Sequence, residues 1–163
     1  MTNTNMRKGF TMIELIFVIV IIGILAAVAI PKLAANRDDA EASTCVHEVG
    51  QLIQEMSASY TDLGHANYVG STIADITNIS TGNQGTKGIT NAGTTTLASG
   101  TGIIYECDNT TVATLTGTDA GADFNLSVVT PAITGLSPAA TKAVTDIAAN
   151  LGVAPATAKV FKL

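Results

Sequence analysis

Glu14 is a carboxylate inside an apolar stretch, and this placement restricts what it can do chemically. Residues 10–30 read FTMIELIFVIVIIGILAAVAI, and only Thr11 and Glu14 interrupt the apolar run. An acid at the centre of a membrane helix costs about 2.5–3.5 kcal/mol, so it is kept where a partner offsets that cost. Ion pairing with a cation in the same apolar setting would offset it. The alternative is that Glu14 reaches the membrane interface, since it lies about one turn from the start of the stretch.

The two cysteines, Cys45 and Cys107, offer thiol chemistry. Their spacing fits no zinc motif, and a lone pair of cysteines in an exported protein is typical of one disulfide. A sheet packed on the helix that carries Cys45 could bring the two sulfur atoms within bonding distance. The closed loop would hold about 61 residues, worth ~4 kcal/mol in the chain-entropy model. Two buried free thiols are the alternative.

The remaining titratable residues suggest no catalytic site and no metal site. His47 and His65 have no cysteine, serine or carboxylate arranged around them as catalysis requires, and we expect both to be solvated or loop residues. Asp119 and Asp123 lie among glycines, but their spacing matches no calcium motif. The sequence therefore predicts a protein that is not an enzyme and that uses no metal or cofactor.

Three asparagines have a Ser or Thr two positions after them, which is the acceptor pattern for N-glycosylation. They are Asn78, Asn109 and Asn125. Such triplets arise often by chance in a chain rich in Ser and Thr. Asn125 is the strongest candidate, because Asp123 lies two places before it, as some bacterial glycosylation systems favour.

Composition excludes nucleic-acid binding and limits the chain to about one domain. The 163 residues carry a net charge of −5, Trp is absent, and the eight Lys and Arg are scattered. No basic patch is available to neutralise phosphates, and few aromatic side chains are available to stack on bases. Charged residues make up only 13% of the chain, about half the usual share.

The apolar stretch predicts a membrane-spanning helix. Its 21 residues would extend about 30 Å as a helix, the thickness of the hydrocarbon core of a bilayer. Arg7 and Lys8 precede it, which predicts a cytoplasmic N-terminus. A cleaved secretory signal peptide is the alternative, but its apolar region would be shorter and would end at a small-residue site.

The helical pattern continues from Lys32 to about Tyr60. Apolar residues recur there at steps of three and four, namely Ala42, Cys45, Val46, Val49, Leu52, Ile53, Met56 and Tyr60. Joined to the apolar stretch, this gives one helix of about 50 residues, ~75 Å long. Gly23 and Pro31 are the weak points within it, and Pro31 favours a kink.

The rest of the chain predicts a small antiparallel sheet and a second helix. Residues 61–102 contain eight glycines and read as a long irregular connection with room for short helical or strand pieces. Strand patterns follow at 103–107, 111–116 and 124–130, and the tail at 158–163 could form another strand. Ser137-Pro138 is typical of a helix start and Gly152 of a helix end. The predicted fold class is α+β, with the long helix packed on the sheet.

Residues 8–16, KGFTMIELI, resemble the processing site of type IV pilins and type II secretion pseudopilins. The resemblance covers roughly residues 7–31, including Pro31, and beyond them it is one of architecture only. It implies cleavage between Gly9 and Phe10 by a prepilin peptidase, N-methylation of Phe10 and a role for Glu14 in assembly. Many type IV pilins close a C-terminal loop with their disulfide. The pair Cys45 and Cys107 departs from that pattern, which leaves the adhesive role of such a loop in doubt here.

The resemblance also implies an organisation and a function. Residues 1–9 would be the leader, 10–31 the transmembrane and assembly helix, and 32–163 a pilin-like domain in the periplasm or outside the cell. The expected function is that of a structural subunit of a type IV pilus-like filament. The expected partners are further copies of the chain, the peptidase, membrane lipid and an inner-membrane assembly platform with an ATPase.

Two alternatives remain open at this stage. A pseudopilin of a type II secretion system would share the N-terminal motif and would form a periplasmic pseudopilus instead of a surface pilus. An ordinary membrane-anchored binding module or enzyme would instead keep its N-terminus intact.

Overall fold

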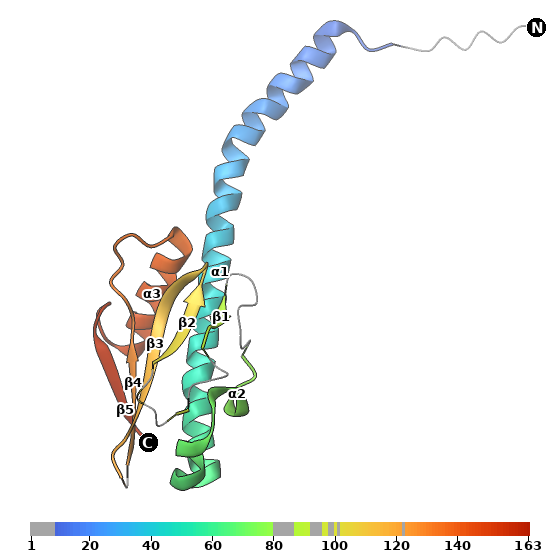
Figure 1. Cartoon of the computed structure of the whole chain (residues 1–163). Helices are drawn as coiled ribbons and strands as arrows, with labels where there is room; N and C mark the ends of the chain where they lie inside the picture. Colours follow the sequence, from blue (N-terminus) through green and yellow to red (C-terminus); the bar gives the residue numbers. More distant parts are fainter. Residues whose placement is uncertain (1–8, 80–86, 92–95, 98–99, 101, 122) are drawn as a thin grey trace, which may run out of the picture. The chain divides into compact units, whose positions relative to one another are not determined.

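The computed structural model describes six ranges of the chain, 9–79, 87–91, 96–97, 100, 102–121 and 123–163. Its contacts divide the chain into two compact units, one that ends at Arg37 and one that comprises Asp38–Leu163. Helix α1 (Met12–Gly70) belongs to the first unit at its start and to the second at its end. Figure 1 shows α1 as the longest element of the chain.

The apolar part of α1 has no protein cover. Every large apolar side chain from Met12 to Leu33 is exposed. Among the described residues, α1 is the one helix long and apolar enough to cross a membrane. Gly23 and Pro31 both lie inside this helix, and neither has the non-helical backbone that marks a break. The predicted kink at Pro31 therefore stays a prediction.

The second part of α1 buries the stripe that its spacing predicts. Five of the stripe residues are fully buried, namely Ala42, Cys45, Val49, Leu52 and Met56. The other three, Val46, Ile53 and Tyr60, are half-buried and pack against the same core. The side chains of Thr44, His47 and Gln54 on the opposite face are exposed.

The helix extends beyond its predicted end at Tyr60. It continues to Gly70, with a break at Gly64, whose φ of 72° and ψ of 159° are not helical. The prediction of an irregular connection is therefore wrong for residues 61–70. Gly64 adopts a positive φ at little cost because it lacks a Cβ. The chain after the break buries Tyr68, which anchors the last turn.

The segment between α1 and the main strands holds two short elements. Helix α2 (Ile73–Ile76) follows Thr72, and strand β1 (Gly88–Ile89) pairs with the first long strand. Ile73 and Ile89 are fully buried, so both elements contribute to the core.

The sheet has five antiparallel strands in the order β1-β2-β3-β4-β5. The longer strands are β2 (Ile103–Cys107), β3 (Thr110–Asp119), β4 (Phe124–Val129) and β5 (Ala158–Lys162). All four confirm predicted strands, although β3 is longer than expected. Asp108 and Asn109 form the turn between β2 and β3, both with positive φ, as a type I′ hairpin requires. The register shifts between Tyr105 and Glu106, and Val112 is the extra residue on β3.

Helix α3 (Pro138–Leu151) confirms the predicted second helix. The Ser137 hydroxyl accepts a hydrogen bond from the Ala140 N–H at 3.3 Å, and Gly152 ends the helix with a φ of 70°. The apolar residues of α3 share one core with the buried face of α1 and the alternate residues of β2, β3 and β4. That face of the sheet is thus covered. Thr114, Thr116, Asn125 and Ser127 alternate with core residues along β3 and β4 and lie on the other face.

Candidate functional site

Thr11 and Glu14 form a closed hydrogen-bonded pair at the start of α1. The backbone N–H and the hydroxyl of Thr11 both donate to Oε2 of Glu14 at 2.8 Å. The Glu14 N–H donates back to the Thr11 hydroxyl at 3.3 Å. This reciprocal arrangement is a capping box, which satisfies donors that the first helical turn would otherwise leave without partners.

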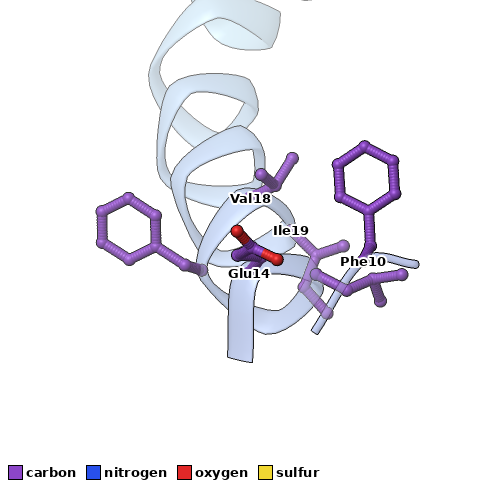
Figure 2. Close-up of a pocket in the computed structure, with 6 residues that line it drawn as sticks. Phe10, Glu14, Val18 and Ile19 are labelled. Carbon is purple, nitrogen blue, oxygen red and sulfur yellow. The ribbon is translucent and has the colours of Figure 1, made fainter. Parts of the chain in front are cut away.

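Apolar side chains lie beside the exposed Glu14 carboxylate. Phe10 is 90% exposed, and an open groove of about 460 Å³ runs along Phe10, Glu14, Leu15, Phe17, Val18 and Ile19. Figure 2 shows the carboxylate of Glu14 near Val18, Ile19 and Phe10. Oε1 of Glu14 accepts no hydrogen bond from any described residue. The carboxylate therefore retains the capacity to accept one more donor.

Gly9 and Phe10 precede the helix in a non-helical, exposed segment. A peptidase that binds an extended substrate can reach the bond between them without unwinding α1. Arg7 and Lys8, the predicted basic residues of the leader, lie outside the described residues.

Sequence analysis missed the role of Thr11. The signal was present, because a Ser or Thr followed three residues later by an acid, just before an apolar run, is the capping-box signature. The presence of this box means that the capping role of Glu14 must be weighed together with its predicted role in assembly.

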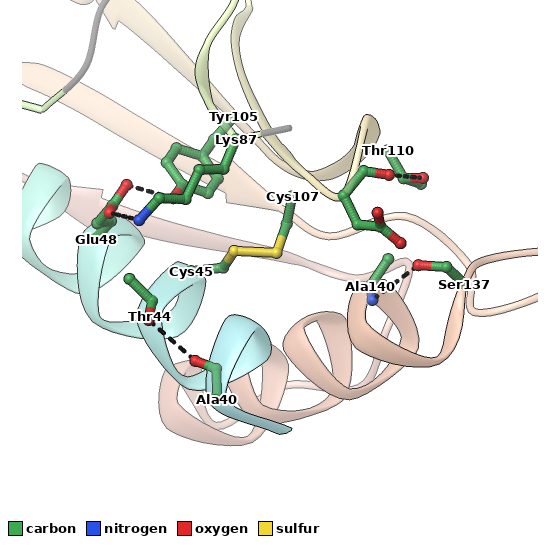
Figure 3. The surroundings of a disulfide bond; sticks show 11 residues. Ala40, Thr44, Cys45, Glu48, Lys87, Tyr105, Cys107, Thr110, Ser137 and Ala140 are labelled. Carbon is green, nitrogen blue, oxygen red and sulfur yellow. Dashed lines mark hydrogen bonds and ion pairs between the residues drawn. A yellow bond between two sulfur atoms is a disulfide. The ribbon is translucent and has the colours of Figure 1, made fainter. Parts of the chain in front are cut away.

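A disulfide joins Cys45 of α1 to Cys107 of β2 (Figure 3). Their Cα atoms are 6.1 Å apart, and both residues are fully buried. The two-free-thiol alternative is therefore wrong in this structure. The bond ties the start of the C-terminal unit to the sheet.

One carboxylate beside the disulfide binds two partners from different segments. Glu48 on α1 accepts from the Lys87 ammonium at 2.5 Å and from the Tyr105 hydroxyl at 2.6 Å (Figure 3). The Glu48 side chain is only 20% exposed. Burial, and then the hydrogen bond to Glu48, raise the pKa of Tyr105 well above its usual value. This group holds α1, β2 and the chain before β1 together, and no sequence motif predicted it.

His65 was expected to be a solvated or loop residue, and it proves to be a partly exposed residue of a helix. His65 lies in α1 directly after the Gly64 break, with Nε2 3.3 Å from the Asp119 carboxylate and Nδ1 3.4 Å from the Tyr60 hydroxyl. The ring thus links the end of α1 to the end of β3. This contact could not be predicted from the sequence, because 54 positions separate His65 from Asp119.

The acids near the β3–β4 turn have separate partners. Asp119 contacts His65 and accepts from the Gly121 N–H, while Asp123 pairs with Lys162 at 2.8 Å. The hydrogen bond from Lys162 to Asp123, and then their mutual attraction, raise the pKa of that lysine. Within the described ranges, no group of three or more His, Cys, Asp or Glu lies close enough to hold a metal ion.

The comparison with protein families matches the segment that contains the Thr11–Glu14 pair. Residues 4–30 carry the prokaryotic N-terminal methylation motif. The motif spans the predicted cleavage position between Gly9 and Phe10, together with Glu14 and Gly23.

Relatives that share this segment include secretion and fimbrial proteins. The chain is 34% identical over 65 residues to the type II secretion system core protein G of Escherichia coli strain K12, covering 40% of this chain and 45% of that protein. It is 46% identical over 48 residues to the type IV major fimbrial protein FimA of Dichelobacter nodosus, covering 29% and 31%. It is 52% identical over 48 residues to the fimbrial protein Q of Moraxella bovis, covering 29% of each.

The similarity is confined to part of each relative. The chain spans less than half the length of these curated relatives. No solved structure matches the chain. The methylation motif and the α+β fold with a long N-terminal helix together confirm the resemblance to pilins and pseudopilins.

Proposed function

We propose that this chain is a structural subunit of a type IV pilus-like filament. In this proposal a prepilin peptidase cleaves between Gly9 and Phe10, Phe10 becomes the methylated N-terminus, and α1 packs against other copies in the filament. Residues 1–9 are the leader, 10–31 the transmembrane and assembly helix, and 32–163 the domain outside the membrane. Before assembly, the subunit spans the bacterial inner membrane with its N-terminus in the cytoplasm.

One observation carries the proposal: a carboxylate inside the exposed apolar part of α1, the part that bears the methylation motif. Exposed apolar surface on this scale needs cover from lipid or from protein. Lipid covers it before assembly, and the helices of neighbouring subunits cover it afterwards. Because both settings are apolar, moving between them gains little free energy from burial alone. An ATP-driven platform in the inner membrane would supply the work.

Glu14 supports a defined contact between copies. Thr11 occupies Oε2, and Oε1 has no partner among the described residues. Cleavage after Gly9 would create an ammonium on Phe10, and the ammonium of a neighbouring copy could donate to Oε1. Removing one member of a buried pair of this kind typically costs 3–5 kcal/mol, because the other charge is left uncompensated. The pair would therefore fix the register between neighbouring subunits.

A pseudopilin of a type II secretion system is the second candidate. The observation that favours it is that three of the relatives are core protein G of type II secretion systems, matched over 65, 43 and 50 residues. The pseudopilus would remain in the periplasm and would act in the secretion of other proteins. The N-terminal chemistry would be the same in both cases.

A deletion strain examined by electron microscopy and by a secretion assay would separate the two functions. Loss of surface fibres with normal secretion is expected for the pilus subunit. Loss of secretion without loss of fibres would identify the pseudopilin instead. N-terminal mass analysis of native material should give a chain that begins with methylated Phe10. A chain that still begins at Met1 would exclude both functions.

A further inference from the structure

We infer that Asn125 is an acceptor for an N-linked glycan, added while the chain is being exported. The donor would be an oligosaccharide linked to a polyprenyl pyrophosphate, and the catalyst a membrane-bound oligosaccharyltransferase. The inference concerns the surface of the folded domain, so it goes beyond assembly through α1. It depends on the proposed function only in that the domain must reach the outer side of the inner membrane.

Residues 123–127 read DFNLS. Strand β4 begins at Phe124, so the side chains from Phe124 to Ser127 alternate between the two faces of the sheet. Phe124 and Leu126 are buried in the core. Because successive side chains in a strand point to opposite faces, Asn125 and Ser127 lie together on the outer face. Both are partly exposed, and neither side chain makes a hydrogen bond among the described residues. The acceptor amide and the required hydroxyl are thus side by side and unengaged.

The outer face has room for a glycan at Asn125. The residues directly opposite it are Thr118 on β3 and Lys162 on β5, and both are exposed. Helix α3 and the buried stripe of α1 belong to the core on the other face. A sugar attached to Asn125 would therefore extend into solvent without displacing any core side chain.

The other two acceptor triplets lack part of this arrangement. Asn109 is exposed in the β2–β3 turn, but a buried cysteine of the disulfide, Cys107, occupies the position two residues before it. Asn78 has Ile76 at that position, and its hydroxyl residue Ser80 lies outside the described residues. Only Asn125 combines the hydroxyl at the second position after it with an acid at the second position before it.

The topology also determines when the reaction can take place. In the finished sheet β4 is hydrogen-bonded to both β3 and β5, so its backbone cannot enter an enzyme cleft. Strand β5 is the last element of the chain, separated from β4 by α3. One edge of β4 therefore stays free until the C-terminal residues arrive, and we expect glycan transfer within that interval.

The chemistry is a substitution without any change in oxidation state. The amide nitrogen of Asn125 forms a bond to C1 of the first sugar, and the bond from C1 to the pyrophosphate oxygen breaks. Polyprenyl pyrophosphate leaves, and the amide gives up one proton to a base of the transferase.

The full chain, produced in bacterial cells with a bacterial oligosaccharyltransferase and its lipid-linked oligosaccharide, tests the site. Peptide mass analysis should find the sugar on the peptide that holds Asn125. Asn125→Gln should abolish it, and Asp123→Ala should lower occupancy at least tenfold. Asn109→Gln is the matched control and should leave occupancy unchanged. An unmodified Asn125 peptide in cells that modify a co-produced acceptor protein would overturn the inference, as would a sugar found on Asn109 instead.

The timing is tested with purified chain and the same enzyme. Reduced, urea-unfolded chain diluted into the reaction should be modified at Asn125, whereas folded, oxidised chain should be modified at least tenfold more slowly. Equal rates would refute the timing. The N-terminal peptide in the same digests reports separately on the proposed function. A methylated Phe10 beside a bare Asn125 would reject the glycan alone, and a glycan on a chain that begins at Met1 would reject the processing alone.

Discussion

Glu14 takes part in one arrangement in this structure, and the proposed function would give its second carboxylate oxygen another. Its hydrogen bonds with Thr11 close the first turn of α1, and its second oxygen is available to a neighbouring subunit. Sequence analysis predicted an ion pair or a position at the interface, and the capping box is a third role. A substitution at Glu14 must therefore be compared with one that affects capping alone.

We expect Glu14→Val to be cleaved and methylated normally but to enter filaments at least tenfold less than the wild type. In the proposed function the peptidase would act between Gly9 and Phe10, away from Glu14. Incorporation of the variant would leave the ammonium of a neighbouring subunit without its carboxylate. N-terminal mass analysis and the amount of sheared fibre measure the two steps. Thr11→Ala removes the cap, worth about 1 kcal/mol, but keeps the carboxylate, so it should reduce incorporation much less. Equal loss in both variants would favour capping as the main role of Glu14.

Tyr105 and Tyr68 should make the fold sensitive to alkali. Burial is the main cause that raises the pKa of each above the ordinary value of about 10. Below that pH both hydroxyls are protonated in the folded and the unfolded chain, so their contribution to stability is complete. As pH rises above about 10, only the unfolded chain releases these protons, and the free energy of unfolding should fall. Urea unfolding from pH 8 to 11, in detergent, measures it, and an unchanged free energy would contradict the assignment.

The two tyrosines provide a matched pair of substitutions. Tyr105→Phe removes the hydrogen bond to Glu48 and should cost about 1 kcal/mol at pH 8. The Tyr68 hydroxyl is buried without a hydrogen-bond partner among the described residues, so Tyr68→Phe should cost nothing or stabilise the fold. In each variant, the free energy of unfolding should fall less steeply above pH 10 than in the wild type. A larger cost for Tyr68→Phe than for Tyr105→Phe would show that the hydrogen bond to Glu48 contributes little.

At the scale of elements, replacing a glycine should have opposite effects on stability in α1 and in β3. A Cβ added to Gly117 in β3 would collide with the Leu97 carbonyl oxygen and the Phe124 ring. Gly50, in the interior of α1, has no atom within 4 Å of the same added group. The first glycine is therefore required by packing, and the second is an avoidable cost to the helix.

We expect Gly117→Ala to lower the free energy of unfolding by about 1–3 kcal/mol or more, because a backbone carbonyl cannot move aside as a flexible side chain can. Gly50→Ala should raise it by about 0.5–1 kcal/mol. Urea unfolding of both variants in detergent checks the two signs. A neutral Gly117→Ala would mean that the segment around Leu97 moves away without cost.

Sequence patterns predicted the elements whose signals are local. Three such signals are the apolar spacing of three and four residues in α1, the Ser137 and Gly152 caps of α3, and the alternation in β4. Each depends only on residues within or next to one element. The 61–70 segment was mistaken for loop because Gly64 and its polar neighbours resemble a connection. Burial of Tyr68 in the core holds it helical, and that contact is not local.

The same limit applies to the candidate site. The Gly9-Phe10 pair and Glu14 follow from adjacent residues and could be predicted from the sequence. Glu48, Lys87 and Tyr105 could not, because the contacts that join them span 39 and 57 positions. These three side chains come together only when the sheet packs on α1.

For the whole molecule, the disulfide is the covalent connection between α1 and the sheet. It encloses the rest of α1 beyond Cys45, together with α2, β1 and β2 as far as Cys107. Cys45→Ala with Cys107→Ala should lower the free energy of unfolding by ~4 kcal/mol, the closure entropy of a loop of this length. Urea unfolding of oxidised wild type and of the double variant measures the difference. A loss below 1 kcal/mol would mean that the unfolded chain is already compact around this loop.

The position of this bond also has a mechanical consequence. In the proposed filament, a load on the domain would pull each subunit between α1 and the part of the domain that bears the load. When the pull enters at α1 and leaves through β2, it crosses the sulfur bridge directly, and the 61 residues enclosed between Cys45 and Cys107 remain slack. Stretched out, that segment would lengthen the subunit by roughly 200 Å. The disulfide would therefore limit how far a loaded subunit of the proposed filament can extend.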